Sequence, residues 1–265
     1  MKAWHRARNL IMNLVGLVWL CAGAVQADSW PTDPQLSGNT FLPPGLIALQ
    51  NDTLNNPLTL WLDKGNTLWR DASGGRSCQS CHGALQAMRQ AAPGFPKLAG
   101  PDATLINLED QILRCRQRTG QAGNRLEDDE VLALSAVLHH AARQQPIAVQ
   151  ADAAHASQWQ AHLEHGAQLF ATRMGRMNLA CMHCHDQNVG KQMRTDVISP
   201  ANPTGFPIYR MAWQRLGTMD RRLRACYSGV QAVLPAPGDP ALRDLELYLK
   251  VRANGLPLDG PSIRR

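Results

Sequence analysis

Two short motifs, 103 residues apart, limit the possible folds of this chain more than any other feature. They are Cys78-Gln79-Ser80-Cys81-His82 and Cys181-Met182-His183-Cys184-His185. Cys-x-x-Cys-His attaches a c-type haem, because the two thiols add to the haem vinyl groups and the His binds the iron. The alternatives for each motif are a redox dithiol or half of a zinc site. The repeated His disfavours a dithiol, and a single later cysteine in each copy disfavours zinc. We therefore expect two covalently bound haems, attached at Cys78, Cys81, Cys181 and Cys184, with His82 and His185 as iron ligands.

The first 27 residues have the pattern of a secretory signal peptide. A basic start precedes a mostly apolar run, Leu10 to Ala24, and the segment ends in small Ala27. We expect cleavage near Ala27 and export to the periplasm. No later stretch reaches about 18 uninterrupted apolar residues, so we expect no membrane span. The remainder carries 24 basic and 21 acidic side chains, an excess too small to indicate a nucleic-acid partner.

The chain also contains an internal repeat. Gly65-x-x-Leu68-Trp69 and Gly166-x-x-Leu169-Phe170 precede the two motifs, and Gly94-Phe95-Pro96 and Gly205-Phe206-Pro207 follow them. A lone cysteine stands 20 residues after each of these Phe residues. The second copy is eight residues longer between its haem motif and Gly205. The repeat therefore predicts two copies of one domain.

The register of the repeat continues into a final helix in each copy. Apolar residues with helical spacing match at an offset of 111, and Asp128 and Asp239 stand where the helix N-caps would fall. The matched apolar residues are Val131, Leu134 and Leu138 in the first copy and Leu242, Leu245 and Leu249 in the second. Trp61 and Trp69, at helical spacing, are expected in the core.

These patterns predict a mainly α protein with two tandem cytochrome c-like haem domains from an internal duplication. The expected parts are the signal peptide (1–27), an N-terminal arm plus the first haem domain (28–148), and the second haem domain (149–265). The arm, Asp28 to about Pro57, is rich in Pro, Asn and Gly and is expected to be irregular.

Of the seven cysteines, Cys21 would leave with the signal peptide and four would attach haem. Cys115 and Cys226 are left over, and three interpretations compete. They form a disulfide, as expected in an oxidising compartment, they are inert core thiols, or each is the second axial ligand of its own haem. Their equivalent positions favour ligation, because a disulfide would require equivalent points of two domains to meet. A thiolate ligand should lower the haem potential relative to Met.

The two copies differ in charge around these cysteines. Arg222 stands four residues before Cys226, on the same helix face, and its counterpart is uncharged Gln111. Leu58 to Cys115 has six basic and five acidic residues, whereas Gln160 to Cys226 has nine and four. An arginine beside a sulfur suits a small sulfur oxyanion. A docking face for a redox partner is the alternative for the other basic residues: Arg173, Arg176, Lys191, Arg194 and Arg215.

With two Cys-x-x-Cys-His motifs, a lone cysteine after each and Arg222 before Cys226, the chain resembles the SoxA family. SoxA is the dihaem subunit of the SoxAX cytochromes of bacterial sulfur oxidation. The resemblance covers nearly the whole chain after the signal peptide. It implies that Cys115 and Cys226 complete the iron coordination of the two haems, that Cys226 is catalytic and carries a persulfide, and that Arg222 binds substrate.

The resemblance also implies the reaction and its partners. The activity would be that of an L-cysteine S-thiosulfotransferase, which joins thiosulfate oxidatively to a cysteine of the carrier protein SoxYZ. Two electrons would pass through haem to a SoxX-type monohaem cytochrome subunit and then to a soluble cytochrome c. The competing hypothesis is a dihaem electron carrier without chemistry of its own. A dihaem peroxidase is a third possibility, disfavoured because it needs an open position on one haem.

Overall fold

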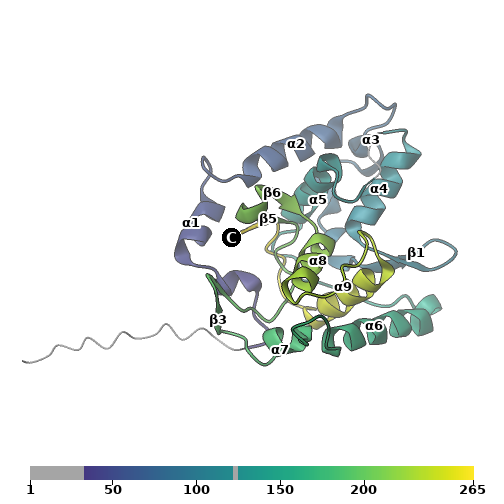
Figure 1. The fold of residues 1–265 in the computed structure, drawn as a ribbon. Helices are drawn as coiled ribbons and strands as arrows, with labels where there is room; N and C mark the ends of the chain where they lie inside the picture. The colour runs from purple at the N-terminus through teal and green to yellow at the C-terminus, as the bar shows by residue number, and fades with distance from the viewer. Residues whose placement is uncertain (1–32, 122–124) are drawn as a thin grey trace, which may run out of the picture.

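The structure, a computed structural model, describes residues 33–121 and 125–265. The predicted signal peptide lies outside these residues. We call residues 33–148 the first half and residues 149–265 the second half. The α-helices are α1 (Pro44–Asn51), α2 (Leu58–Arg70), α3 (Cys78–His82), α4 (Leu108–Arg118), α5 (Asp129–Ala141), α6 (Ala156–Ala171), α7 (Cys181–His185), α8 (Met219–Gly229) and α9 (Pro240–Arg252). The strands are β1 (Lys97–Ala99), β2 (Thr104–Ile106), β3 (Gln192–Met193), β4 (Asp196–Val197), β5 (Ile208–Arg210), β6 (Arg215–Gly217) and β7 (Ser262–Arg264). The prediction of a mainly α protein is confirmed (Figure 1).

Each half is built on one close helix crossing, α2 on α5 and α6 on α9. A glycine lies at each crossing point. A Cβ on Gly65 would come within 2.3 Å of the Ala133 carbonyl oxygen, and one on Gly166 within 2.1 Å of the Asp244 carbonyl oxygen. Only a residue without a side chain allows these backbones to meet. Helix packing therefore explains Gly65 and Gly166 of the sequence repeat.

Where the two halves meet, equivalent residues make reciprocal contacts, as expected for an approximate two-fold rotation. Pro146 forms an antiparallel bridge with Pro257, its equivalent at the offset of 111. The Gln144 amide donates to the Leu258 carbonyl, and the equivalent Gly255 amide donates to the Ile147 carbonyl, each at 2.9 Å. The segment that we expected to separate the domains is therefore paired with the end of the second half. This relation is what an internal duplication predicts; the duplication itself remains a prediction.

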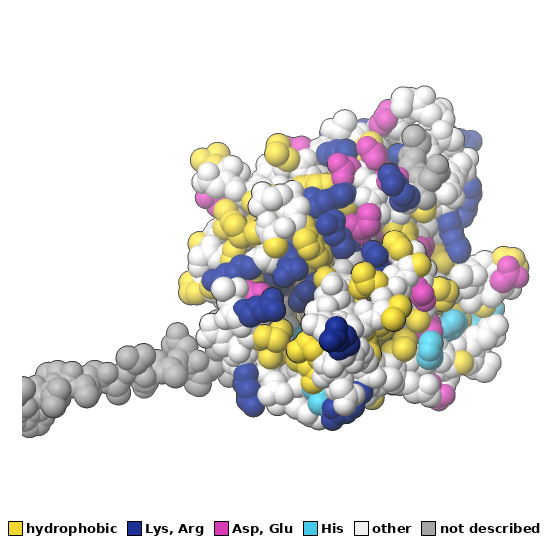
Figure 2. Space-filling view, in the orientation of Figure 1, with side chains coloured by type: hydrophobic (Ala, Val, Ile, Leu, Met, Phe, Trp, Pro, Cys, Tyr) yellow, Lys and Arg dark blue, Asp and Glu magenta, His cyan; other side chains and the backbone are white. Residues whose placement is uncertain are grey.

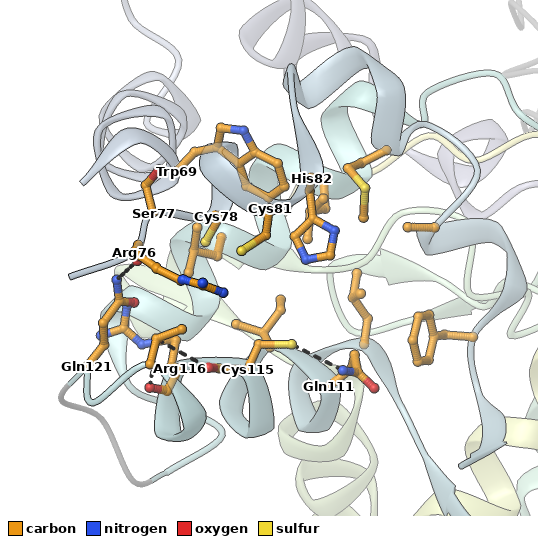
Figure 3. Close-up of a pocket in the computed structure, with 18 of the residues that line it drawn as sticks. Trp69, Arg76, Ser77, Cys78, Cys81, His82, Gln111, Cys115, Arg116 and Gln121 are labelled. Atoms are coloured by element: carbon orange, nitrogen blue, oxygen red, sulfur yellow. Dashed lines mark hydrogen bonds between the residues drawn. The ribbon is translucent and has the colours of Figure 1, made fainter. Parts of the chain in front are cut away.

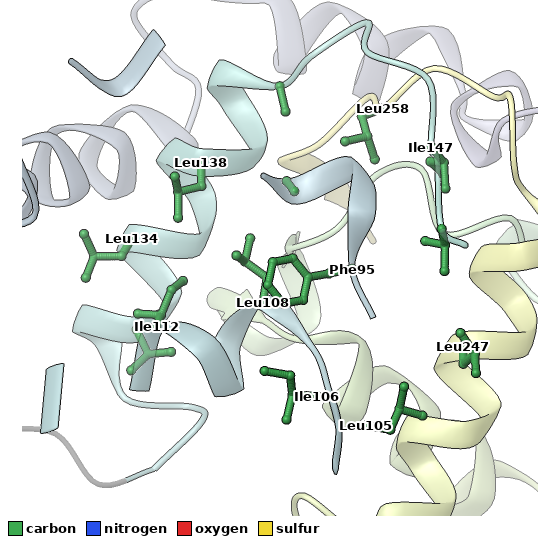
Figure 4. Close-up of a cluster of buried hydrophobic side chains, with 14 of the residues drawn as sticks. Phe95, Leu105, Ile106, Leu108, Ile112, Leu134, Leu138, Ile147, Leu247 and Leu258 are labelled. Carbon is green, nitrogen blue, oxygen red and sulfur yellow. The ribbon is translucent and has the colours of Figure 1, made fainter. Parts of the chain in front are cut away.

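A single large hydrophobic cluster spans both halves (Figure 4). Phe95 lies at its centre in the figure, and Leu247 of α9 and Leu258 belong to the same cluster. The predicted core residues of α5 and α9 are all buried: Val131, Leu134, Leu138, Leu242, Leu245 and Leu249. Asp128 and Asp239 are the N-caps of these helices, as predicted. Trp69 is buried, as expected for a core residue, and Trp61 is partly buried.

A buried group of charges also joins the halves. The Arg243 guanidinium of α9 contacts Asp110 of α4 at 2.7 Å and Asp220 of α8 at 3.5 Å. Glu246 lies 3.8 Å from the same guanidinium and accepts a hydrogen bond from Asn107, the N-cap of α4. Because α4 and α8 carry the two lone cysteines, Arg243 fixes the beginnings of both cysteine-bearing helices relative to each other.

The sheets differ between the halves. β1 and β2 form a two-stranded antiparallel sheet, whereas β5 pairs with β6 antiparallel and with β7 in parallel. The eight-residue longer connection in the second half contains the β3–β4 hairpin. The second half therefore has two local additions, a hairpin and a third strand, that the first half lacks among its described residues.

The N-terminal arm is more regular than predicted and lies against the second half. It contains α1, and its residues Pro34 and Leu36 accept hydrogen bonds from Asn202. Gln50 accepts one from the Ile263 amide of β7. Burial of an apolar side chain explains why α1 forms: Leu46 packs in a hydrophobic cluster with Leu132 of α5 and Ile263 of β7. No helix in the described ranges is both long and apolar enough to cross a membrane.

Candidate haem sites and an arginine-lined cavity

Both Cys-x-x-Cys-His motifs form short helices with a capped beginning. Ser77 accepts a hydrogen bond from the Ser80 amide at the start of α3. At the start of α7, the Ala180 amide donates to His183 Nδ1 at 2.9 Å. Such contacts satisfy amides that a helix leaves free at its beginning. His183, to which the sequence analysis assigned no function, therefore has a structural role.

The first half contains a cavity of about 450 Å³ between α3 and α4. Cys78, Cys81 and His82 lie on one wall, and Cys115 lies on the opposite wall (Figure 3). The rest of the lining is mostly apolar side chains: Trp69, Met88, Phe95, Leu108, Ile112, Leu134 and Leu138. The predicted ligands of the first haem are therefore brought together around one apolar space.

The second half has a cavity of about 180 Å³ lined by His185 and Cys226. Phe206, Ile208 and Leu223 supply apolar lining. Cys181 and Cys184 do not line this cavity. Both lie near Cys226, whose thiolate charge would contribute to raising their pKa. Burial raises the pKa of the Cys181 thiol to about 11, with a further contribution from Cys226.

The histidine of the second motif is oriented by the main chain. His185 Nδ1 lies 2.6 Å from the Ser199 carbonyl oxygen, to which it donates as the Nδ1–H tautomer. The lone pair of Nε2 is then left for a metal, which is the usual arrangement of a ligating histidine. His82 has no such hydrogen bond among the described residues; its ring lies 6.1 Å from the Trp69 ring.

The lone cysteines are free thiols, one in each cavity. The disulfide interpretation is therefore wrong. Cys115 Sγ accepts a hydrogen bond from Gln111 Nε2 at 3.2 Å (Figure 3). Gln111 is the counterpart of Arg222, which lines the second cavity beside Cys226. The structure thus places an amide next to one sulfur and a guanidinium in the cavity of the other.

Most basic residues that the sequence analysis named lie away from the second cavity. Arg215 contacts Asp129 of the first half, and Arg173 donates to the Asn178 carbonyl. Arginines that it did not single out line the cavity instead: Arg210, Arg264 and Arg265. Arg210 lies on β5, Arg264 on β7 and Arg265 directly after β7. None of them is on the helix of Cys226, so helical spacing could not identify them.

Three other histidines, His139, His162 and His165, pack within the fold. His162 and His165 of α6 both contact the Asp244 carboxylate of α9, at 2.7 and 2.5 Å. His139 is buried, and burial lowers its pKa to about 3, so it is neutral. Across the described ranges, no three His, Cys, Asp or Glu side chains gather as a zinc site would require.

The residues of both cavities fit a c-type haem. At the first cavity, two thiols, a histidine one residue later and a sulfur on a facing helix surround an apolar space. At the second, His185 and Cys226 line the cavity, and Cys181 and Cys184 lie on the same short helix as His185. Cationic side chains at the first cavity, Arg76, Lys97 and Arg116, suit the carboxylates that haem carries. These features define a cytochrome of the c type with covalently attached haem.

Comparisons with known proteins also indicate a c-type cytochrome, and they narrow the assignment to one family. Residues 64–147 match the family model of the SoxA/TsdA cytochrome c domain. A SoxA subunit from Rhodovulum sulfidophilum is 32% identical over 235 residues, covering 86% of this chain and 79% of the relative. One from Pseudaminobacter salicylatoxidans is 29% identical, covering 91% and 85%. Both relatives are named L-cysteine S-thiosulfotransferase subunits.

The fold gives the same result. The crystal structure of SoxXA from P. pantotrophus superimposes with a TM-score of 0.78 at 28% identity, covering 86% of each chain. This chain belongs to the SoxA family.

Proposed function

We propose that the chain holds two c-type haems, one in each half, and acts as the catalytic haem subunit of a thiosulfate-oxidising L-cysteine S-thiosulfotransferase. Cys78 and Cys81 would hold the first haem, with His82 and Cys115 as iron ligands. The second haem would be attached and ligated by Cys181, Cys184, His185 and Cys226. The assignment is supported by the four residues that meet at the first cavity and by His185 and Cys226, which line the second.

One observation carries the proposed activity. Arg222, Cys226 and His185 line the same cavity, whereas the equivalent position in the first half carries uncharged Gln111. An arginine beside a sulfur can hold a sulfonate and balance its charge. An electron carrier without chemistry needs no such asymmetry between its halves.

The reaction joins thiosulfate to a cysteine thiol of a SoxYZ-type carrier. The products are a cysteine S-thiosulfonate, one proton and two electrons. Haem, when bound, supplies the one-electron path by which these electrons leave. The Cys226 sulfur would bond to the outer sulfur of thiosulfate as the two electrons leave. The carrier thiolate would then attack that outer sulfur, which releases Cys226 and completes the transfer.

Arg222 has a positioning and electrostatic role in these steps. Its guanidinium would hold the sulfonate oxygens while the outer sulfur lies against Cys226. His185, held by the Ser199 carbonyl, would keep its Nε2 available for the haem iron.

The partners and location follow from this proposal. A SoxX-type monohaem cytochrome would form a heterodimer with the chain and take up the electrons, which then pass to a soluble cytochrome c. The likeness to a SoxXA structure supports the heterodimer. The protein would act in the periplasm after cleavage near Ala27, as haem attachment requires an exported chain.

Replacement of Arg222 tests the activity. The Arg222→Ala complex should lose most of its thiosulfate- and carrier-dependent cytochrome c reduction, about a hundredfold, with both haems still attached by intact mass. Arg173→Ala is the matched control, because Arg173 is an exposed arginine of the same half that contacts the Asn178 carbonyl. Equal turnover in the wild type and Arg222→Ala would instead support the electron-carrier alternative.

A further inference from the structure

The second cavity contains more positive charge than Arg222 alone supplies. Arg210, Arg264 and Arg265 also line it, and Asp196 is its single acidic lining residue within the described ranges. Figure 2 shows Lys and Arg side chains gathered beside α1 and around the C-terminus, on this side of the molecule. Burial lowers the pKa of Arg264 to about 10, and repulsion from Arg222 contributes. An anion entering the cavity would relieve this repulsion.

The local additions of the second half supply these groups. Arg264 lies on β7, which pairs with β5 and has no counterpart in the two-stranded sheet of the first half. Asp196 lies on the β3–β4 hairpin, the other addition. The common haem-binding framework therefore does not require Arg264, which indicates a task specific to the second half.

Arg264 is held in place by the N-terminal arm. Its Nη2 donates to Asn39 Oδ1 at 2.9 Å, and its Nη1 donates to the Ile263 carbonyl at 2.8 Å. The guanidinium packs on Gly205, where an added Cβ would lie 2.8 Å from Nη2. Asn39 is itself anchored, because its main-chain amide donates to Ser37 Oγ. The Ser37 hydroxyl in turn contacts Thr204 and Asp259 of the second half. The side chain is thus oriented before any ligand binds.

Arg210 is held by different contacts. Its Nε donates to the main-chain oxygen of Arg265 at 2.7 Å, and its guanidinium lies 5.3 Å from the Trp213 ring centroid. Arg264 differs from Arg210 in two respects that favour it as the second partner for an anion: the arm orients it through Asn39, and it lies on β7, which the first half lacks among its described residues.

We propose that Arg264 is a second thiosulfate-binding residue, which holds the sulfonate together with Arg222, and that Asn39 of the arm positions it. This inference rests on the proposed function. Two guanidiniums favour a divalent oxyanion over a monovalent one, so Arg264 would contribute to substrate selection. The arm would then be part of the substrate site rather than only a covering segment.

The test measures thiosulfate binding and turnover separately, with the complete haem-loaded complex. In Arg264→Gln, the thiosulfate KM and the calorimetric Kd should both rise about tenfold, since one charged hydrogen bond is lost. The kcat at saturating thiosulfate should change less than about twofold. Asn39→Ala should give a smaller rise of the same kind, and Arg264→Lys should recover part of the affinity.

Two controls separate this role from others. Gln50→Leu removes the hydrogen bond from the arm to the Ile263 amide without touching Arg264, and should leave KM unchanged. Lys191→Gln removes an exposed cation of the same half and should also have no effect. An equal rise in Gln50→Leu would show that the arm merely needs to be attached, and would overturn the inference.

The remaining outcomes are also decisive. A changed haem spectrum or potential in Arg264→Gln, with unchanged thiosulfate affinity, would assign Arg264 to the haem carboxylates and overturn the inference. Wild-type turnover with unaltered KM in Arg264→Gln would overturn it and leave the proposed function standing. Arg264-dependent thiosulfate binding without any carrier modification would support the inference and contradict the proposed function.

Discussion

Gln111 Nε2 donates a hydrogen bond to Cys115 Sγ at 3.2 Å. In the second half, Arg222 occupies the position equivalent to Gln111. A hydrogen bond to a ligating sulfur withdraws charge from it and so favours the reduced iron. If Cys115 binds the iron of the first haem, as we propose, Gln111 should raise the potential of that haem.

Gln111→Leu tests this effect. The potential of the first haem should fall by about 20–60 mV, because a typical hydrogen bond is worth about 0.5–1.5 kcal/mol. Spectroelectrochemical titration of the oxidised complex measures the potential. Gln117→Leu, on the exposed face of the same helix, should leave it unchanged. A fall of equal size in both variants would mean that the Gln111 hydrogen bond has no specific effect.

The glycine at the α6–α9 crossing should be essential for stability. Gly166→Ala places a Cβ 2.1 Å from the Asp244 carbonyl oxygen, so the helices must separate at a cost of about 1–3 kcal/mol. Urea unfolding of the haem-loaded protein measures the loss. Gly45→Ala is the matched control in α1, where a Cβ meets no atom within 4 Å; it should be neutral or stabilise by up to about 1 kcal/mol. Equal midpoints for both variants would contradict the crossing geometry.

The buried Glu246 should make stability depend on pH. Burial raises its pKa from 4.5 to about 7, against the opposing attraction of Arg243. The native state therefore favours the protonated form, whose stabilising contribution is present below pH 4.5 and is lost as pH rises through 7.

The free energy of unfolding should accordingly fall across this interval by at most about 1.4 kcal/mol per pH unit. Glu246→Gln should flatten this part of the curve, because an amide can keep the contact with Asn107 without titrating. Glu164→Gln, at an exposed position of α6, should keep the wild-type slope. Retention of the full slope in Glu246→Gln would show that another group is responsible, and buried Glu109, whose pKa burial also raises, would be the first to examine.

Much of the fold could be predicted from local patterns that recur. The Cys-x-x-Cys-His motifs, the apolar spacing of α5 and α9 and the N-cap positions of Asp128 and Asp239 are short-range features, which depend on neighbours in the sequence. The equivalent positions of Cys115 and Cys226 argued against a disulfide, and both are free thiols; their ligation of haem remains a prediction.

The contacts between distant segments could not be predicted in this way. Nothing near Asn39 in the sequence indicates that it meets Arg264, 225 positions later. The arm was expected to be irregular and was grouped with the first domain, yet its hydrogen bonds reach Asn202 and Ile263 of the second half. Arg264 was missed for the same reason, since it joins the site through the parallel pairing of β7 with β5.

The most direct test of the central claim is the intact mass of a SoxYZ-type carrier after incubation with this protein, its SoxX-type partner, thiosulfate and oxidised cytochrome c. The account predicts a thiosulfonate adduct on the carrier cysteine with the wild type and none with Cys226→Ala. An unmodified carrier with the wild type, in a sample whose haems are loaded and reducible, would contradict it and favour an electron carrier. An adduct of equal yield with Cys226→Ala would contradict the assignment of Cys226 as the sulfur that accepts thiosulfate.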